Sequence, residues 1–403
     1  MICRTAQMGT IMQYDFDKII DRRGTDSVKH DLLHPVFGTE NVLPMWVADM
    51  DFEVPDFICS AIRKRADHPV YGYTFRPRRF YEIIADWMGR RHQWDVDPDR
   101  ISFSPGIVPA LNLSVLAFTK PGDRIVIQPP VYFPFFSAIR DHDRELVTNN
   151  LVNSGGTYSM NLNHLEDLFR EGARMMLFCH PHNPVGKVWQ RHELEKLAEL
   201  CIRYDVLVIS DEIHSDLLLF GNSHIPFASL DEAIAARTIT CIAPSKTFNL
   251  AGLHSSALII PEPSLKVRYE QMLDRMHIGG GNLFGMVAME AAYTFGEEWL
   301  TQLIHYLEKN ALYLVDILGK ELPDLIVSPI EATYLAWLDL SFLNMDDEGL
   351  KKFIIEKARL GLNDGPMFGP GGEGHQRINI AVPRKILEEA ASRLVRAVKD
   401  SYI

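Results

Sequence analysis

The stretch Val206-Leu-Val-Ile-Ser-Asp-Glu-Ile-His214 is a short apolar run followed directly by polar residues. The pattern recurs at residues 174–186, where Arg-Met-Met-Leu-Phe-Cys leads into His-Pro-His-Asn-Pro-Val-Gly. It recurs again at residues 238–249, where Thr-Ile-Thr-Cys-Ile-Ala leads into Pro-Ser-Lys-Thr-Phe-Asn. Short runs without polar alternation are typical of strands buried on both faces. They predict a mostly parallel sheet covered by helices on both sides.

The neighbouring sequence extends this pattern in both directions. Further strands are predicted at 101–104, 124–128 and 256–260, with helices such as 111–118 and 192–204 between strands. After Gly281 the strands and helices no longer alternate. The predicted elements there are helical residues 282–321 interrupted near 295–296, a strand at 332–340, a helix at 346–359, a loop at 365–374, a strand at 377–382 and a helix at 386–402. This order predicts a second, smaller α+β domain.

Length and composition agree with a two-domain globular protein. The chain has 403 residues, of which 47% are hydrophobic, and its net charge of −12 disfavours nonspecific binding to nucleic acids. No apolar run reaches the roughly 20 residues of a membrane helix, and the first residues lack the apolar core of a signal peptide. The five cysteines are scattered without a CxxC pair. We therefore expect reduced thiols in a cytoplasmic protein, with no zinc or other metal site.

Polar side chains follow the predicted strands, and ligands bind at the carboxyl ends of strands in an open α/β sheet. Lys246 follows the run 238–243. Burial there would lower its pKa and make it a nucleophilic amine, although a solvated loop lysine is the more usual case. Asp211 follows the run 206–210. A carboxylate buried there needs a partner such as a cationic ring nitrogen, unless it only caps a helix.

Two more strand ends carry weaker signals. Asn183 lies between prolines in a rigid turn, where it serves either as a ligand contact or as an ordinary turn residue. Pro105-Gly106-Ile107-Val108 precedes a helix whose first N–H groups can bind an anion, although a plain strand-to-helix turn looks the same. Taken together, an amine, a carboxylate, an amide and an anion-binding turn match the requirements of pyridoxal phosphate (PLP).

With these motifs, the chain resembles fold-type-I PLP-dependent enzymes of the aminotransferase class I/II superfamily. The Leu43-Pro-Met-Trp-Val-Ala-Asp-Met-Asp-Phe52 segment makes it most similar to the MalY/PatB-type C–S lyases, the cystathionine β-lyase branch. The resemblance covers nearly the whole chain and rests on Arg23–Lys29, Leu43–Phe52, Tyr71–Thr74, Ser104–Val108, Pro130–Tyr132, His182–Gly186, Ser210–His214, Ser245–Gly252 and Arg377–Ile380.

The resemblance implies catalytic roles for three residues. Lys246 would carry the cofactor as a Schiff base and move the Cα proton of the substrate. Asp211 would keep the pyridinium nitrogen protonated, and Tyr132 would stack on the ring.

The resemblance also implies binding roles. Gly106, Ile107, Val108 and Ser245 would hold the cofactor phosphate, and Tyr71 would reach the phosphate of a neighbouring subunit. Asn183 would bond the ring hydroxyl and face the substrate, whose α-carboxylate Arg377 would bind. The residues whose assignment stays open between the site and ordinary packing are His214 as a cofactor contact, Trp46 as a substrate contact and Asp49.

The implied architecture is a large PLP-binding α/β domain at 46–285 with a mostly parallel seven-stranded central sheet. A smaller α+β domain would combine residues 1–45 and 286–403, and two chains would form a homodimer. One position departs from the superfamily pattern. His254 lies eight residues after Lys246, at a position where the superfamily usually has a basic residue, most often Arg. A second cation at the phosphate is therefore in doubt near neutral pH.

The implied reaction is α,β-elimination on L-cystathionine or related cysteine S-conjugates, which yields a thiol such as homocysteine, pyruvate and ammonia. It would place the enzyme in amino-acid metabolism and methionine biosynthesis. An aminotransferase on the same scaffold is the main alternative, because both reactions share the cofactor contacts. A PLP-binding regulatory protein is the third reading, and the joint presence of Lys246, Asp211 and Arg377 favours catalysis over it.

Overall fold

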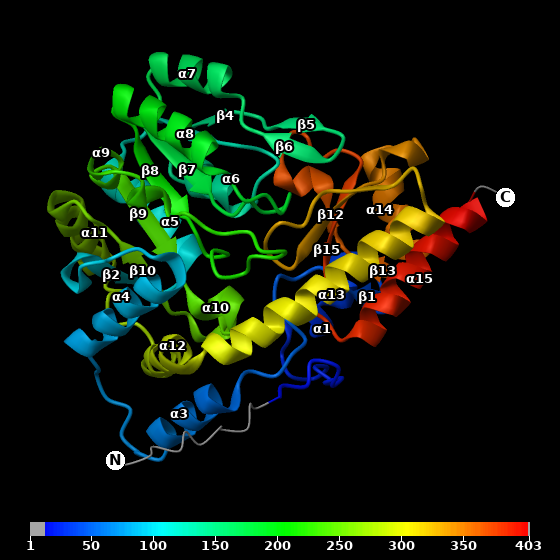
Figure 1. Ribbon diagram of the computed structural model, residues 1–403, viewed down its shortest axis with the longest axis horizontal. Helices are drawn as coiled ribbons and strands as arrows, with labels where there is room; N and C mark the ends of the chain where they lie inside the picture. Colours follow the sequence, from blue (N-terminus) through cyan, green and yellow to red (C-terminus); the bar gives the residue numbers. More distant parts are fainter. Residues whose placement is uncertain (1–12, 402–403) are drawn as a thin grey trace, which may run out of the picture.

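The computed structural model describes residues 13–401, whose central feature is a seven-stranded sheet (Figure 1). The strand order is β2-β10-β9-β8-β7-β3-β4, and only β10 runs antiparallel to its neighbours. These strands are β2 (Ile101–Ser104), β3 (Arg124–Ile127), β4 (Glu145–Thr148), β7 (Met175–Cys179), β8 (Leu207–Asp211), β9 (Thr238–Ile242) and β10 (Ser256–Ile259). The prediction of a mostly parallel sheet is confirmed. The edge strand β4 was not predicted, because its Glu and Thr residues break the apolar pattern.

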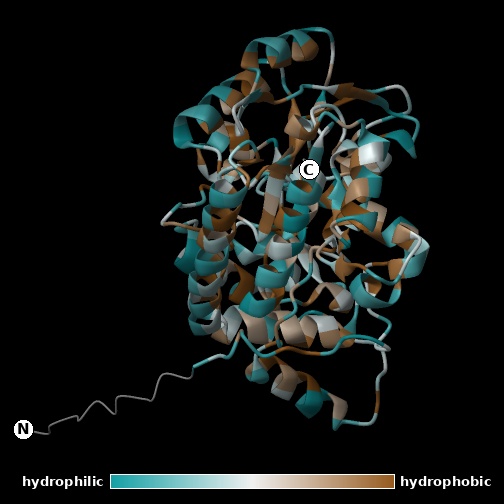
Figure 2. Ribbon diagram, turned by 90° about the vertical axis from the view of Figure 1, so that its right-hand side faces the viewer, coloured by the Kyte–Doolittle hydropathy of each residue, from teal (hydrophilic) through white to brown (hydrophobic). Residues whose placement is uncertain are grey.

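Both faces of this sheet are buried, as the unbroken apolar runs predicted. Along β7, alternate side chains join opposite cores: Met176 and Phe178 pack on one side, Met175 and Leu177 on the other. The first side is covered by helices α7 (Leu162–Arg170) and α8 (Arg191–Arg203), the second by α5 (Ile107–Phe118) and α11 (Pro263–Met276). Figure 2 shows the mainly hydrophobic strands behind helices that present hydrophilic residues outward.

A second, four-stranded sheet is formed by the C-terminal part of the chain, in the order β11-β12-β15-β14. Its strands are β11 (Ile326–Val327), β12 (Leu335–Asp339), β14 (Asn363–Asp364) and β15 (His375–Asn379). The helices of this region are α13 (Glu297–Glu321), α14 (Asp347–Glu356) and α15 (Arg384–Ser401), and α15 lies beside α13 (Figure 1). The predicted mixture of strands and helices is present, with boundaries shifted by a few residues.

The predicted helix interruption near 295–296 is present between α12 (Leu283–Phe295) and α13. A Cβ atom on Gly296 would lie 2.3 Å from the Phe248 ring, so only glycine fits there. α12 packs against α3 (Asp56–Ala66) and α4 (Arg78–His92). The domain boundary proposed at 285/286 falls inside α12, and the division into two domains stays a prediction.

The N-terminal part of the chain pairs with the C-terminal part. Strand β1 (Leu43–Pro44) runs parallel to β13 (Leu360–Gly361). Residues 1–12 lie outside the described residues. They include Cys3 and most of the N-terminal segment for which we predicted the absence of a signal peptide. The cysteines that are described carry free thiols: Cys59, Cys179, Cys201 and Cys241. No helix between residues 13 and 401 combines the length and apolar character that crossing a membrane requires.

Candidate active site

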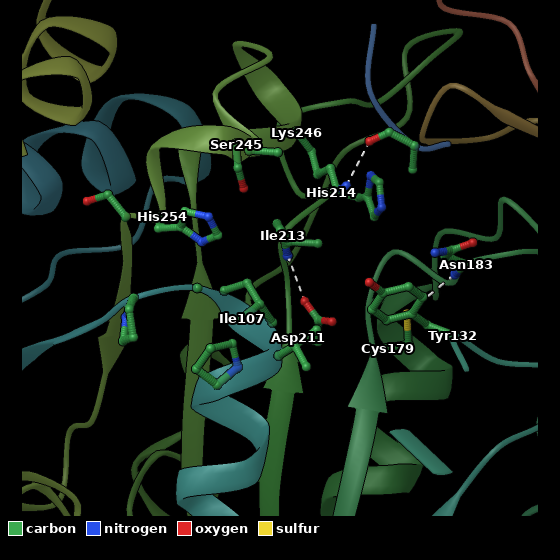
Figure 3. Close-up of a pocket in the computed structure, with 17 residues that line it drawn as sticks. Ile107, Tyr132, Cys179, Asn183, Asp211, Ile213, His214, Ser245, Lys246 and His254 are labelled. Atoms are coloured by element: carbon green, nitrogen blue, oxygen red, sulfur yellow. Dashed lines mark hydrogen bonds between the residues drawn. The ribbon is translucent and has the colours of Figure 1, made fainter. Parts of the chain in front are cut away.

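A cavity of about 280 Å³ opens at the carboxyl ends of β7, β8 and β9, next to the start of α5 (Figure 3). The parallel strands end at one edge of the sheet, which brings distant segments of the chain together there. Lining residues that the sequence singled out are Gly106, Ile107, Val108, Tyr132, Asn183, Asp211, His214, Ser245, Lys246 and His254. Figure 3 shows Ser245, His254 and Ile107 on one side of the cavity, and Tyr132 and Asn183 on the other.

Lys246 lies on the one-turn helix α10 (Pro244–Thr247), directly after β9. Its Nζ donates a hydrogen bond of 2.7 Å to the backbone carbonyl of Ala48, and no carboxylate forms an ion pair with it within residues 13–401. Burial, and next the charge of Arg377, lower the pKa of Lys246 to about 8, against the opposing charges of Asp49 and Asp211. The share of this amine that is neutral and nucleophilic near physiological pH is therefore much larger than for an ordinary lysine.

Asp211 is the last residue of β8 and is almost fully buried. Its Oδ1 accepts a hydrogen bond of 3.2 Å from the Ile213 N–H, and no described cation pairs with it. Burial raises the pKa of Asp211 to about 7, although that hydrogen bond and the charge of Lys246 act in the opposite direction. A buried carboxylate with so little compensation suits a cationic ligand group placed beside it.

Helix α5 begins directly after Gly106, whose φ of +149° suits glycine. The backbone N–H groups of Ile107 and Val108 stand in the first turn of this helix, where they have no partner along it. Ser245 and His254 line the same part of the cavity. This end of the cavity therefore collects hydrogen-bond donors, which suits an anionic group.

Arg377, on β15, is buried without a carboxylate partner in the described chain. Its Nη1 donates to Asn183 Oδ1 at 2.9 Å, and its Nη2 donates to Asn363 Oδ1 at 2.6 Å and to the Trp46 carbonyl at 3.2 Å. The buried Nε has no partner. Burial lowers the pKa of Arg377 to about 10. A buried guanidinium that meets only neutral acceptors suits an incoming carboxylate.

Two further side chains that line the cavity are Tyr132 and His214. Burial raises the pKa of the Tyr132 hydroxyl to about 12, so this residue stays neutral. Burial and the charges of Lys246 and Arg377 lower the pKa of His214 well below its usual value, so its ring is neutral as well. The His214 Nδ1 is buried without a hydrogen-bond partner, which leaves it free for a ligand.

Three residues predicted to contribute lie outside the lining of this cavity: Arg377, which contacts it through Asn183, and Trp46 and Tyr71, which have other partners. The Trp46 indole donates its Nε1 hydrogen to the Lys29 carbonyl at 3.1 Å and packs edge-on against Phe37. Tyr71 is 59% exposed, and its hydroxyl donates to the Ala66 carbonyl at 2.8 Å. Within one chain, neither the Trp46 nor the Tyr71 side chain reaches the cavity, so their assigned roles stay predictions.

The structure also brings in groups that the sequence did not single out. The Ala48 carbonyl accepts hydrogen bonds from both Lys246 and the Tyr334 hydroxyl, the latter at 2.8 Å. Asn363 is an acceptor for Arg377. A backbone carbonyl and an isolated asparagine have no sequence signature, because their importance depends on which residues pack next to them. The two histidines of the His180-Pro-His182 turn bond backbone carbonyls, His180 that of Ile225 and His182 that of Pro130.

Comparison with known proteins agrees with this arrangement. The family profile "Aminotransferase class I and II" matches residues 41–394. Cystathionine beta-lyase PatB of Bacillus subtilis (strain 168) is 43% identical over 385 residues, which cover 95% of this chain and 100% of that protein. Crystal structures of cystalysin from Treponema denticola, which contains a PLP cofactor, and of a PLP-bound C–S lyase from Staphylococcus hominis are similar throughout. Their TM-scores are 0.94 and 0.90, at 38% and 36% identity, with 97% and 96% of this chain and 100% and 98% of theirs covered. This chain belongs to the aminotransferase class I and II family.

Proposed function

We propose that this protein is a PLP-dependent C–S lyase that performs α,β-elimination on L-cystathionine or related cysteine S-conjugates. The observation that carries the proposal is a set of buried, uncompensated charges around one cavity. Lys246 has a lowered pKa, Asp211 has no cation partner, and Arg377 has no carboxylate partner. The similarity to cystathionine beta-lyase PatB and to the staphylococcal C–S lyase supports elimination over transamination.

The residues around the cavity fit the chemistry of PLP. Asp211 would pair with the cationic ring nitrogen, Asn183 would bond the ring hydroxyl, and Tyr132 would stack on the ring. The residues that would hold the phosphate or another edge of the cofactor are Gly106, Ile107, Val108, Ser245, His214 and, from a neighbouring subunit, Tyr71. When bound, PLP supplies an electron-withdrawing ring that stabilises negative charge at the substrate Cα.

The chain's own residues then have distinct tasks. Lys246 would hold the cofactor through its amine, and its freed Nζ would take the Cα proton of the substrate. Arg377 would hold the substrate α-carboxylate with its planar fork. Asn183 would face the substrate, and Trp46, which lies outside the cavity lining, is proposed as a further substrate contact. Asp211 would keep the ring nitrogen of the cofactor protonated. With cystathionine, the balanced reaction consumes one water and releases homocysteine, pyruvate and ammonia.

Three wider statements belong to this proposal. A homodimer is supported by the exposed aromatic side chains of the segment that carries Tyr71, namely Tyr71, Tyr73 and Phe75. The two-domain division at 46–285 against 1–45 plus 286–403 is supported by the parallel pairing of β1 with β13. A cytoplasmic location is supported by the free thiols of the described cysteines, and a role in methionine biosynthesis would follow from homocysteine release.

Product analysis tests the reaction. The purified protein is incubated with L-cystathionine, with an S-alkyl cysteine, and with each amino acid plus a keto-acid acceptor, while pyruvate, ammonia and free thiol are measured. We expect all three products in equal amounts without an acceptor, and none with Lys246→Ala. Acceptor-dependent formation of a keto acid without thiol release would instead identify an aminotransferase. Absence of both reactions, with the cofactor bound, would favour the regulatory protein.

A further inference from the structure

Residues 46–51 form a segment that contacts both basic side chains of the candidate active site, Lys246 and Arg377. The Ala48 carbonyl accepts the 2.7 Å hydrogen bond from Lys246 Nζ. Two residues earlier, the Trp46 carbonyl accepts the 3.2 Å hydrogen bond from Arg377 Nη2. The position of this backbone segment therefore bears directly on where the amine and the guanidinium lie.

Basic side chains from residues 22–30 form ion pairs with the carboxylates of residues 46–51. Arg22 makes two hydrogen bonds to the Asp49 carboxylate, at 2.6 and 3.0 Å, and one to Asp51 at 2.6 Å. Lys29 is completely buried, with its Nζ 2.9 Å from Asp51 Oδ2 and 3.9 Å from Asp49 Oδ1. His30 adds a third contact, 3.3 Å from Asp51. Two basic side chains, Arg22 and Lys29, thus face two carboxylates within a largely buried cluster.

Neutral contacts hold the same segment independently of these charges. The Asn379 amide donates to the carbonyls of Val47 and Asp49, at 2.7 and 2.6 Å. The Asn249 side chain accepts from the Met50 N–H and donates to the Met50 carbonyl. Loss of a single charge from the cluster therefore leaves the backbone of the segment attached to the rest of the protein.

The cluster matters for Lys246 because of Asp49. Burial and the charge of Arg377 lower the pKa of the Lys246 amine, whereas the charges of Asp49 and Asp211 raise it. The neutral hydroxyl of Tyr334 and the neutral ring of His214 also lie near the amine. The guanidinium of Arg22 is bound directly to Asp49 and offsets part of its negative charge. Without Arg22, the amine would experience the Asp49 carboxylate more strongly.

We propose that Arg22 is a positioning residue of the active site, which holds Asp49 and the 46–51 segment so that the Ala48 carbonyl faces the Lys246 amine and the Asp49 charge is screened from it. The inference rests on the proposed function, because it treats Lys246 as the lysine that carries the cofactor. The proposal also explains a function for the motif at residues 22–30, which has no role in the proposed reaction.

The test is a pH titration of the absorbance band of the bound cofactor in the holoenzyme, which reports the proton at Lys246 without any turnover. We expect Arg22→Gln to raise the midpoint by about one pH unit and Asp49→Asn to lower it, while the double variant returns toward the wild type. Arg22→Lys, which keeps the positive charge, should have a midpoint close to that of the wild type. Arg23→Gln is the matched control, because Arg23 is exposed and pairs with Asp21 and with no other described residue; its midpoint should equal that of the wild type.

The outcomes separate this inference from the proposed function. A wild-type protein that shows no cofactor band dependent on Lys246 contradicts the proposed function itself. A normal wild-type band whose midpoint moves with neither Arg22→Gln nor Asp49→Asn overturns only the role of Arg22. If the melting curve shows that Arg22→Gln does not fold, the Asp49→Asn and Arg22→Lys variants decide the question. A lowered midpoint for Asp49→Asn together with an unchanged midpoint for Arg22→Lys supports the role of Arg22. Any other pair of results overturns it.

Discussion

At the scale of single residues, the site is defined by charges that the protein buries without neutralising them. Burying an ionised group costs several kcal/mol unless a partner of opposite charge accompanies it. Within residues 13–401, Lys246 and Arg377 have only neutral acceptors, and Asp211 has only an N–H donor. Such groups reduce the stability of the cofactor-free protein. We therefore expect bound ligands to supply the missing partners.

The first prediction concerns the pH dependence of cofactor binding. Because the pKa of Lys246 is lowered to about 8, the reactive neutral amine should be lost as the pH falls below this value. The rate at which cofactor-stripped protein captures PLP should therefore decrease about tenfold per pH unit below 8, where an ordinary lysine would do so below about 10. Stopped-flow absorbance measures this rate, and Lys246→Ala is the control. A midpoint near 10 would contradict the prediction.

The second prediction concerns Arg377. Arg377→Ala removes the charged hydrogen bonds to the substrate carboxylate, each worth about 1.5–3 kcal/mol, so KM for the amino acid should rise about 10- to 100-fold per bond lost. Steady-state kinetics of pyruvate release measure the change. Decarboxylated analogues of the substrate serve as the control ligands, since their weak competitive inhibition should not change. An equal loss of affinity for both ligands would show that Arg377 has a structural role instead.

At the scale of elements, the cavity depends on close packing between helices and the loops at the strand ends. Gly285 in α12 shows this most clearly, because a Cβ atom there would lie 2.2 Å from the Leu253 carbonyl oxygen and 3.2 Å from the Ser255 side chain. Ser255 and the preceding His254 line the cavity. The start of α12 thus supports the wall that we assign to the phosphate.

The third prediction follows from this contact. Gly285→Ala should push the turn around Leu253 outward, lower the free energy of unfolding by about 1–3 kcal/mol and weaken retention of PLP during dialysis. Gly319→Ala is the matched control, since Gly319 lies exposed in α13 with no atom within 4 Å of the new Cβ. It should stabilise the protein by about 0.5–1 kcal/mol and leave PLP retention unchanged. Chemical denaturation and cofactor absorbance measure both effects. Equal behaviour of the two variants would contradict the prediction.

At the scale of the whole molecule, one chain does not account for every expected contact. Tyr71 lies outside the cavity of its own chain, in a segment that exposes Tyr73 and Phe75 to solvent. Exposed aromatic side chains grouped in this way are typical of an interface. In a symmetric dimer, Tyr71 of each chain would complete the site of the other.

The fourth prediction is complementation between inactive variants. Lys246→Ala and Tyr71→Ala each damage a different part of a shared site. Mixed dimers of the two should contain one intact site and one site with both defects. After unfolding and refolding together, an equal mixture should recover about one quarter of the wild-type activity. Each variant refolded alone is the control. A mixture no more active than the two variants separately, or a purified active protein with the mass of one chain, would contradict the shared site.

The sequence alone determined the kind of sheet and the chemistry at its edge. Apolar runs followed by Asn183, Asp211 and Lys246 predicted buried parallel strands, and parallel strands must bring their carboxyl ends to one edge. The tertiary structure decided what surrounds these groups. The Ala48 carbonyl that faces Lys246 is 198 residues away from it in the chain, and the Asn183 amide that meets Arg377 is 194 residues away. Local sequence patterns encode periodicity and side-chain chemistry, whereas these contacts depend on how separate elements pack. The burial and the unbalanced charge that make the site reactive depend on the same packing.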